Sequence, residues 1–139
     1  MSDYDSDIVD WSGHQAALLR RMAAGERVAN LDWGNIIEEI ESVGRSQLDA
    51  VESLLTQAFL HDLKAEAWPL SRDVAHWRAE ARLFRRQARR RFTPSMRHKL
   101  DVADLYADAL AGLPETLDGQ PPLRATELCP VTLDELLAR

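Results

Sequence analysis

Apolar side chains recur every three or four positions near the start of the chain, the spacing of an amphipathic helix. Ile8, Trp11, Leu18 and Met22 fall largely on one face of a helix drawn over residues 7–24. Gly25 follows the last apolar position, where a left-handed C-terminal cap favours a residue without a Cβ atom. The pattern therefore predicts a first helix that ends at about residue 24.

The longest periodic segment runs from about residue 32 to residue 65. Asp32 or Asn30 can cap its start, and Trp68-Pro69 stops it because proline disfavours helical geometry at the preceding residue. The segment predicts one long amphipathic helix. Its apolar positions are Ile36, Ile37, Ile40, Val43, Leu48, Val51, Leu54, Leu55, Phe59 and Leu63.

An unbroken helix of this extent would be about 50 Å long, whereas a compact domain of this chain length is only about 37 Å across. Either the helix protrudes and pairs with a second subunit, or it bends near Gly44, where helix propensity is low. A protruding end would expose Ile36, Ile37 and Ile40, and soluble monomers seldom leave large apolar patches uncovered. We therefore expect a homodimer, with a bent monomer as the alternative.

Two further helices are predicted after the long one. Thr93-Pro94 is typical of an N-cap followed by proline at the first helical position, so the fourth helix starts there and ends at Gly112. Its expected inward face consists of Met96, Leu100, Ala103, Ala107 and Leu110. The third helix, capped by Ser71 or Asp73, has a stripe formed by Val74, Trp77, Ala81, Phe84 and Ala88.

The tail from Glu115 to Pro130 has little periodicity, and Thr132 with Glu135 forms a capping-box pattern that predicts a short final helix up to Leu137. No strand pattern is present. The expected fold is all-α, an up-and-down antiparallel helical bundle of four to five helices. It forms a single domain over residues 1–139, with a long second helix and an irregular C-terminal strap.

Composition narrows the class of protein. The 139 residues carry a formal net charge of −6 and a single cysteine, Cys129, which excludes an internal disulfide framework and a multi-thiolate zinc site. No apolar run approaches the roughly 20 residues that cross a bilayer, and the acidic start lacks the basic and apolar regions of a signal peptide. We therefore expect a cytoplasmic protein with no membrane partner.

Glu38, Glu39 and Glu41 are the strongest candidates for chemistry, because carboxylates three residues apart on a helix can present oxygens to a hard cation. This pattern supports a metal-dependent hydrolase or nuclease as one alternative. The Glu-x-x-His motif of di-metal bundles is absent, however. The simpler interpretation is that the glutamates lie in the first turns, complement the helix dipole and pair with Arg45. We expect no metal and no cofactor.

His61 and Lys64 lie near the end of the long helix, with Asp62 and Glu66 among them. A histidine flanked by carboxylates can serve as a base, but no serine or cysteine nucleophile can be placed beside it. A structural role is favoured, because a lysine at a helix C-terminus complements the dipole and Trp68 can pack over the turn.

The third helix is rich in arginine. Between Arg72 and Lys99 there are ten lysine and arginine residues against two acidic ones. An exposed cationic face is predicted, and such a face suits phosphate, which makes a nucleic-acid binder the second alternative. Nucleic acid is the less favoured partner because the chain is acidic and the segment lacks interleaved aromatics. Pairing with acidic side chains such as Asp49 and Glu52, or with a protein partner, is expected instead. The predicted face is formed by Arg85, Arg86, Arg89 and Arg90.

Four blocks of sequence carry a family resemblance. They are Tyr4 to Asp7 followed by Trp11, the run NIIEEIESVGRS over residues 35–46, Thr93 to Arg97, and Cys129 to Leu133. In these blocks the chain resembles a bacterial family catalogued as domain of unknown function number twenty-nine, whose members look like small all-helical proteins. The resemblance covers nearly the whole chain and implies the fold, with no established activity.

The function predicted is that of a non-enzymatic protein-interaction module. Charge is segregated along the chain, and no nucleophile, cofactor or metal pattern can be assigned. A second copy of the chain or an unidentified protein is the expected partner.

Overall fold

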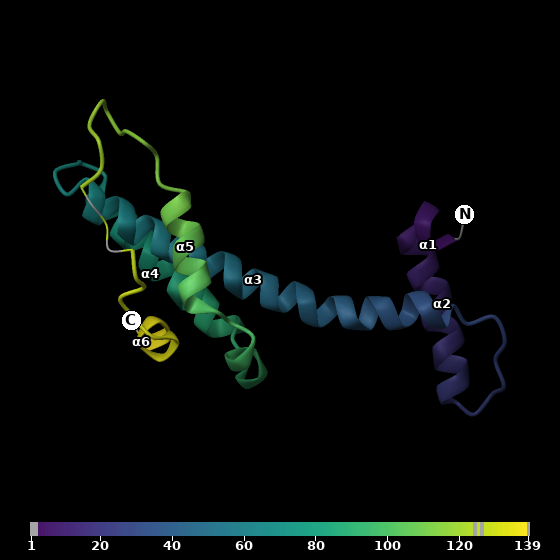
Figure 1. Cartoon of the computed structure of the whole chain (residues 1–139). Coiled ribbons are helices and arrows are strands. Elements are labelled where there is room, and N and C mark those ends of the chain that lie inside the picture. Colours follow the sequence, from purple (N-terminus) through teal and green to yellow (C-terminus); the bar gives the residue numbers. More distant parts are fainter. Residues whose placement is uncertain (1–2, 124, 126, 139) are drawn as a thin grey trace. The chain divides into compact units, whose positions relative to one another are not determined.

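The computed structural model describes residues 3–123, 125 and 127–138. Within these residues the chain is helical and contains no strand, apart from one isolated bridge between Leu117 and Gln120. The all-α prediction is confirmed. The elements of the chain in order are α1 (Asp3–Ser6), α2 (Ile8–Ala23), α3 (Trp33–Ala67), α4 (Val74–Arg91), the 3-10 helix η1 (Pro94–His98), α5 (Val102–Ala111) and α6 (Leu133–Ala138). Figure 1 labels the six α-helices.

The chain divides into two compact units, an N-terminal unit over Met1–Arg45 and a C-terminal unit over Ser46–Arg139. The long helix α3 contributes residues to both, and it continues through Gly44, so this glycine does not end it. Its first turn, which begins at Trp33, contains no acidic residue. The predicted dipole effect of the three glutamates is therefore wrong, because the dipole's influence falls off within the first turn.

In the N-terminal unit, α2 begins at an aspartate cap and ends at a glycine. The Asp7 carboxylate accepts a hydrogen bond from the Asp10 backbone N–H at 3.0 Å. Gly25 has φ +96°, the left-handed conformation that its position predicted. The side chains of Trp11, Gln15 and Leu18 are buried on one face of α2, and α3 contributes the buried Ile36.

The C-terminal unit contains the larger apolar core. One face of α3 is buried against residues from α4, α5 and α6, and these helices lie beside the C-terminal part of α3 in Figure 1. Burial of this kind is the main favourable term in folding. The buried members of the core are Val51, Leu55, Phe59, Leu63, Ala88, Met96, Leu105, Tyr106, Ala109, Val131 and Leu136.

The predicted fourth helix is wrong in its extent and in two of the five residues of its inward face, whereas Met96 is buried in the core and Leu100 and Leu110 pack against it. The segment after Thr93-Pro94 forms only the 3-10 helix η1, and α5 starts afresh at Asp101, whose carboxylate accepts from the Asp104 backbone N–H at 3.2 Å. The interruption resets the helical phase. Leu105, Tyr106 and Ala109 are therefore buried, whereas the predicted core positions Ala103 and Ala107 are exposed.

The strap before α6 is irregular, as predicted, and is fixed to the end of α3 by main-chain hydrogen bonds. A tight turn at Asp118 and Gly119, both with positive φ, presents the Gln120 carbonyl to the Trp68 indole N–H at 3.0 Å. The Leu123 N–H donates to the Ala67 carbonyl, also at 3.0 Å. The capping box of α6 is confirmed, since Thr132 and Glu135 each accept from the other's backbone N–H.

Candidate functional site

Four large apolar side chains of α3 are exposed within the N-terminal unit. They follow one another at intervals of four, three and three residues, and between 51% and 68% of each is exposed. We call this set the apolar stripe: Trp33, Ile37, Ile40 and Val43. Ile36 was predicted to be exposed with its neighbours, but only 7% of its surface is accessible and it is buried. An uncovered patch of this kind is typical of an interaction surface.

Glu38, Glu41 and Arg45 form an exposed ion-pair cluster on the same stretch of α3. Arg45 Nη2 lies 2.7 Å from Glu38 Oε1, and Arg45 Nη1 lies 3.8 Å from Glu41 Oε2. The predicted pairing of Arg45 with Glu41 is present, and Glu38 joins it. Because all three side chains are more than half exposed, the cluster contributes little to stability.

Glu39 is separated from that cluster by its own partner, the Tyr4 hydroxyl, which donates to Glu39 Oε1 at 2.5 Å. This hydrogen bond, together with the negative charge of Glu39, raises the pKa of Tyr4, so the phenol remains neutral. The three glutamates therefore make contacts of two different kinds. In the part of the chain that the structure describes, no three His, Cys, Asp or Glu side chains are grouped to hold a metal ion.

Asp32 is the centre of a polar network. The sequence predicted only that Asp32 could cap the long helix, and the other contacts of the network were missed. Asp32 Oδ2 accepts from the Trp11 indole N–H at 3.0 Å and from Asn35 Nδ2 at 2.8 Å. The Asp32 backbone N–H donates to Gln15 Oε1 at 2.9 Å. Tyr4 packs edge-on against Trp11, with ring centroids 4.9 Å apart. The network ties α1 and α2 to the start of α3.

This network predicts a pH dependence. Hydrogen bonds from Asn35 and Trp11 lower the pKa of Asp32 below its ordinary value of 3.8. The carboxylate therefore stabilises the folded state above that pH, and the contribution is lost as pH falls through the lowered pKa. We expect wild-type protein to lose thermal stability below about pH 4 more steeply than Asp32→Asn does. Melting curves between neutral and acid pH measure this difference, and parallel losses in both proteins would contradict the role of Asp32.

In the C-terminal unit, Asp62 joins two arginines of α4. Its Oδ1 lies 2.7 Å from Arg78 Nη1 and its Oδ2 lies 2.6 Å from Arg85 Nη1. Only 7% of the Arg85 side chain is exposed. The prediction that Arg85 lies on an exposed face is wrong, because Arg85 stands four residues after Ala81 and three before Ala88, both fully buried.

The other residues near the end of α3 make no ion pair within the described part of the chain. His61 Nδ1 donates to the Gln57 carbonyl at 2.8 Å, and its ring lies 5.2 Å from that of Phe84. Lys64 is half-buried in the last turn of α3. Asp62, which sequence reasoning treated only as a neighbour of His61, is the residue of this segment with the strongest charged contacts.

The exposed arginines of α4 are a separate feature. Arg89 donates to the Leu137 carbonyl at 3.0 Å. Among the residues that the structure describes, five exposed arginines of α4 have no carboxylate within ion-pair distance: Arg82, Arg86, Arg89, Arg90 and Arg91. The predicted pairing of these arginines with Asp49 or Glu52 is wrong. Burial and the nearby charges of Asp49, Asp104 and Asp108 instead raise the pKa of Glu52.

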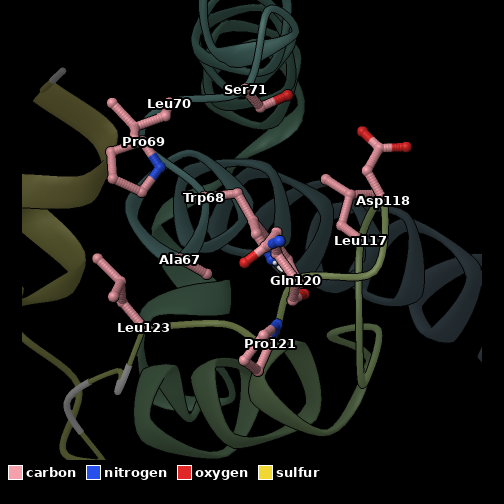
Figure 2. A pocket seen from close by; sticks show the side chains of 10 residues that line it. All are labelled: Ala67, Trp68, Pro69, Leu70, Ser71, Leu117, Asp118, Gln120, Pro121 and Leu123. Carbon is pink, nitrogen blue, oxygen red and sulfur yellow. Dashed lines mark hydrogen bonds between the residues drawn. The ribbon is translucent and has the colours of Figure 1, made fainter.

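A hollow of about 310 Å³ lies where the strap meets the end of α3. Figure 2 shows Trp68 beside Gln120 in its lining, joined by the indole hydrogen bond. Leu70, on the same rim, is 99% exposed. The lining is mostly apolar, with Ser71 and Asp118 as its hydroxyl and carboxyl side chains.

These features define an all-helical protein with an exposed apolar stripe and an arginine-rich helix. The chain belongs to the family described as "Domain of unknown function DUF29", whose model matches residues 4–139. The family resemblance seen in the sequence is confirmed. No helix in the described part of the chain is both long and apolar enough to traverse a membrane.

One solved structure is similar over almost the whole chain. It is the crystal structure of an alpha-helical protein of unknown function from Rhodospirillum rubrum, which is 26% identical and superposes with a TM-score of 0.67. The match covers 99% of this chain and 90% of that protein. No match was found among curated proteins.

Proposed function

We propose that this protein is a non-enzymatic interaction module that associates with a second copy of itself through the apolar stripe. The observation that carries the proposal is the exposure of Trp33, Ile37, Ile40 and Val43 along one stretch of α3. Covering these side chains removes apolar surface from water, which is the main driving force of association. The carboxylates considered for catalysis support the non-enzymatic part, since Arg45 engages Glu38 and Glu41 and the Tyr4 hydroxyl engages Glu39.

The charges beside the stripe are self-complementary about a two-fold axis. Glu38 and Arg45 are seven residues apart, two helical turns, and therefore lie on the same flank of α3. In an antiparallel pair of helices related by a two-fold axis, the same flank of each helix faces its counterpart. With the axis between Glu41 and Ser42, Glu38 of one copy lies opposite Arg45 of the other, and Ile40 lies opposite Val43. This register pairs opposite charges and buries apolar side chains together.

The first test is the oligomeric state. Light scattering at micromolar concentration should give about twice the 15.7 kDa chain mass. Ile40→Glu should weaken association by at least about tenfold, because it places a carboxylate in an apolar interface. Leu70→Glu is the matched control, since Leu70 is also exposed but lies in the other unit, and it should remain dimeric. A wild-type monomer, or an Ile40→Glu dimer of unchanged affinity, would contradict the proposal.

Charge reversal tests the register of the two-fold pair. Glu38→Arg and Arg45→Glu should each self-associate more weakly than wild type, because each places like charges opposite one another across the axis. Mixing the two variants restores both opposite-charge pairs between copies, while positions 38 and 45 within each chain still carry like charges. Sedimentation of the mixture should therefore show a dimer again. A mixture no tighter than the separate variants would exclude this register.

A further inference from the structure

We infer that a second hollow, formed by α3 and α4 within the C-terminal unit, binds an acidic peptide segment of a partner protein that also inserts an aliphatic side chain. The hollow has a volume of about 510 Å³, within the range of ligand pockets. Its lining residues are Ala50, Leu54, Gln87, Arg90 and Arg91. This inference uses none of the residues of the apolar stripe.

The lining combines two kinds of surface. Ala50 and Leu54, from α3, are partly buried and apolar, and they form a surface on which an aliphatic side chain can pack. Arg90 and Arg91, from the last turn of α4, are exposed and supply two guanidinium groups. Gln87 adds an amide that can donate to or accept from a peptide backbone. A ligand that fits this lining has carboxylates next to a branched apolar group.

The guanidinium groups are free to take such a ligand. Arg86 stands one helical turn before Arg90, and within the described residues none of Arg86, Arg90 and Arg91 has a carboxylate partner. Arginine presents a planar fork that holds a carboxylate through two parallel hydrogen bonds. The negative end of the α4 dipole accounts for basic residues in the last turn, but within the described residues no side chain pairs with the guanidinium groups of Arg90 and Arg91.

A peptide fits these observations better than a nucleic acid. The apolar part of the lining is aliphatic, and it offers no aromatic ring on which a base could stack. The chain carries a net charge of −6, which repels a long polyanion at a distance. A short acidic segment meets the arginines locally and buries its apolar side chain in the hollow.

Fluorescence anisotropy with the full chain tests the inference. The probe is a labelled synthetic peptide of glutamates interrupted by two leucines, and its comparison peptide has serine in place of each leucine. We expect the leucine peptide to bind at least about tenfold tighter than the serine peptide. Arg90→Glu with Arg91→Glu should lose at least about tenfold in affinity for the leucine peptide, because two carboxylate partners become repulsive.

The matched control is Arg72→Glu with Lys99→Glu, which changes the net charge equally at two exposed positions of the same unit outside the hollow. It should retain binding within about threefold. Circular dichroism verifies that both variants fold. Equal affinity for the two peptides, equal losses in both double variants, or tighter binding of a single-stranded oligonucleotide than of the leucine peptide would each overturn the inference. Ile40→Glu should bind the peptide normally, which separates this outcome from that of the proposed dimer.

Discussion

Asp62→Ala is expected to lower the free energy of unfolding by about 3–5 kcal/mol, because it leaves the buried Arg85 guanidinium without a counter-charge. Arg85 is 7% exposed and Asp62 is 18% exposed, so neither is well solvated in the folded state. Arg85 Nε is also buried, and it has no hydrogen-bond partner in the described structure. Asp62 therefore supplies the charge compensation that this arginine needs. Urea denaturation followed by circular dichroism measures the loss.

Asp134→Ala is the matched control for this prediction. Asp134 pairs with Arg97 at 2.7 Å, the same distance as Asp62 to Arg78, but its side chain is 76% exposed. An exposed ion pair of this kind contributes at most about 1 kcal/mol. If the two variants lost similar free energies of unfolding, the burial of Arg85 would not be the cause of the destabilisation in Asp62→Ala.

Leu55→Ala should lower the free energy of unfolding by about 2–5 kcal/mol, through the loss of buried methyl groups and the cavity left behind. Leu55 is fully buried in the core of the C-terminal unit, on the face of α3 that packs against α4 and α5. The same denaturation experiment measures the change. A loss well below this range would mean that the core collapses around the vacated volume.

Leu70→Ala provides the comparison for Leu55→Ala. Leu70 is 99% exposed, so the same chemical change there removes almost no buried surface and should alter stability by less than about 0.5 kcal/mol. A large effect at Leu70 would show that the rim of the 310 Å³ hollow is covered in solution.

Local signals predicted much of the fold. The apolar spacing of α3 and the proline after Trp68 placed that helix at 32–65, and the structure has it at Trp33–Ala67. Gly25 and the Thr132–Glu135 box marked helix ends by chemistry that acts over a few residues. Helix ends of this kind can be predicted from the sequence because the residues that form them are only a few positions apart.

Features that depend on distant residues were missed. Arg85 was predicted to be exposed because it recurs at helical spacing with Arg86, Arg89 and Arg90, opposite the apolar face of α4. Its burial depends on its partner Asp62, which is 23 residues away on another helix. The break before α5 was missed because residues 96–110 also offer apolar positions at the three- and four-residue spacing of one continuous helix, which runs through the cap at Asp101.

Of the candidate site, sequence reasoning identified Ile37, Ile40 and the pairing of Glu41 with Arg45. The hydrogen bonds from Trp11 and Gln15 to Asp32 could not be predicted, since they require α2 and α3 to be placed beside each other. The spacing of Asp32 and Asn35 was the one local hint of that network.

The continuity of α3 has a consequence for how the protein acquires its structure. Starting a helix is unfavourable because several residues must be fixed before the first hydrogen bond forms, whereas each later residue adds a bond. Residues 46–67 of α3 are anchored by the core of the C-terminal unit, and residues 33–45 belong to the same helix. Once the core has formed, residues 33–45 can therefore extend an existing helix instead of nucleating a new one. The apolar stripe then needs no partner to become helical.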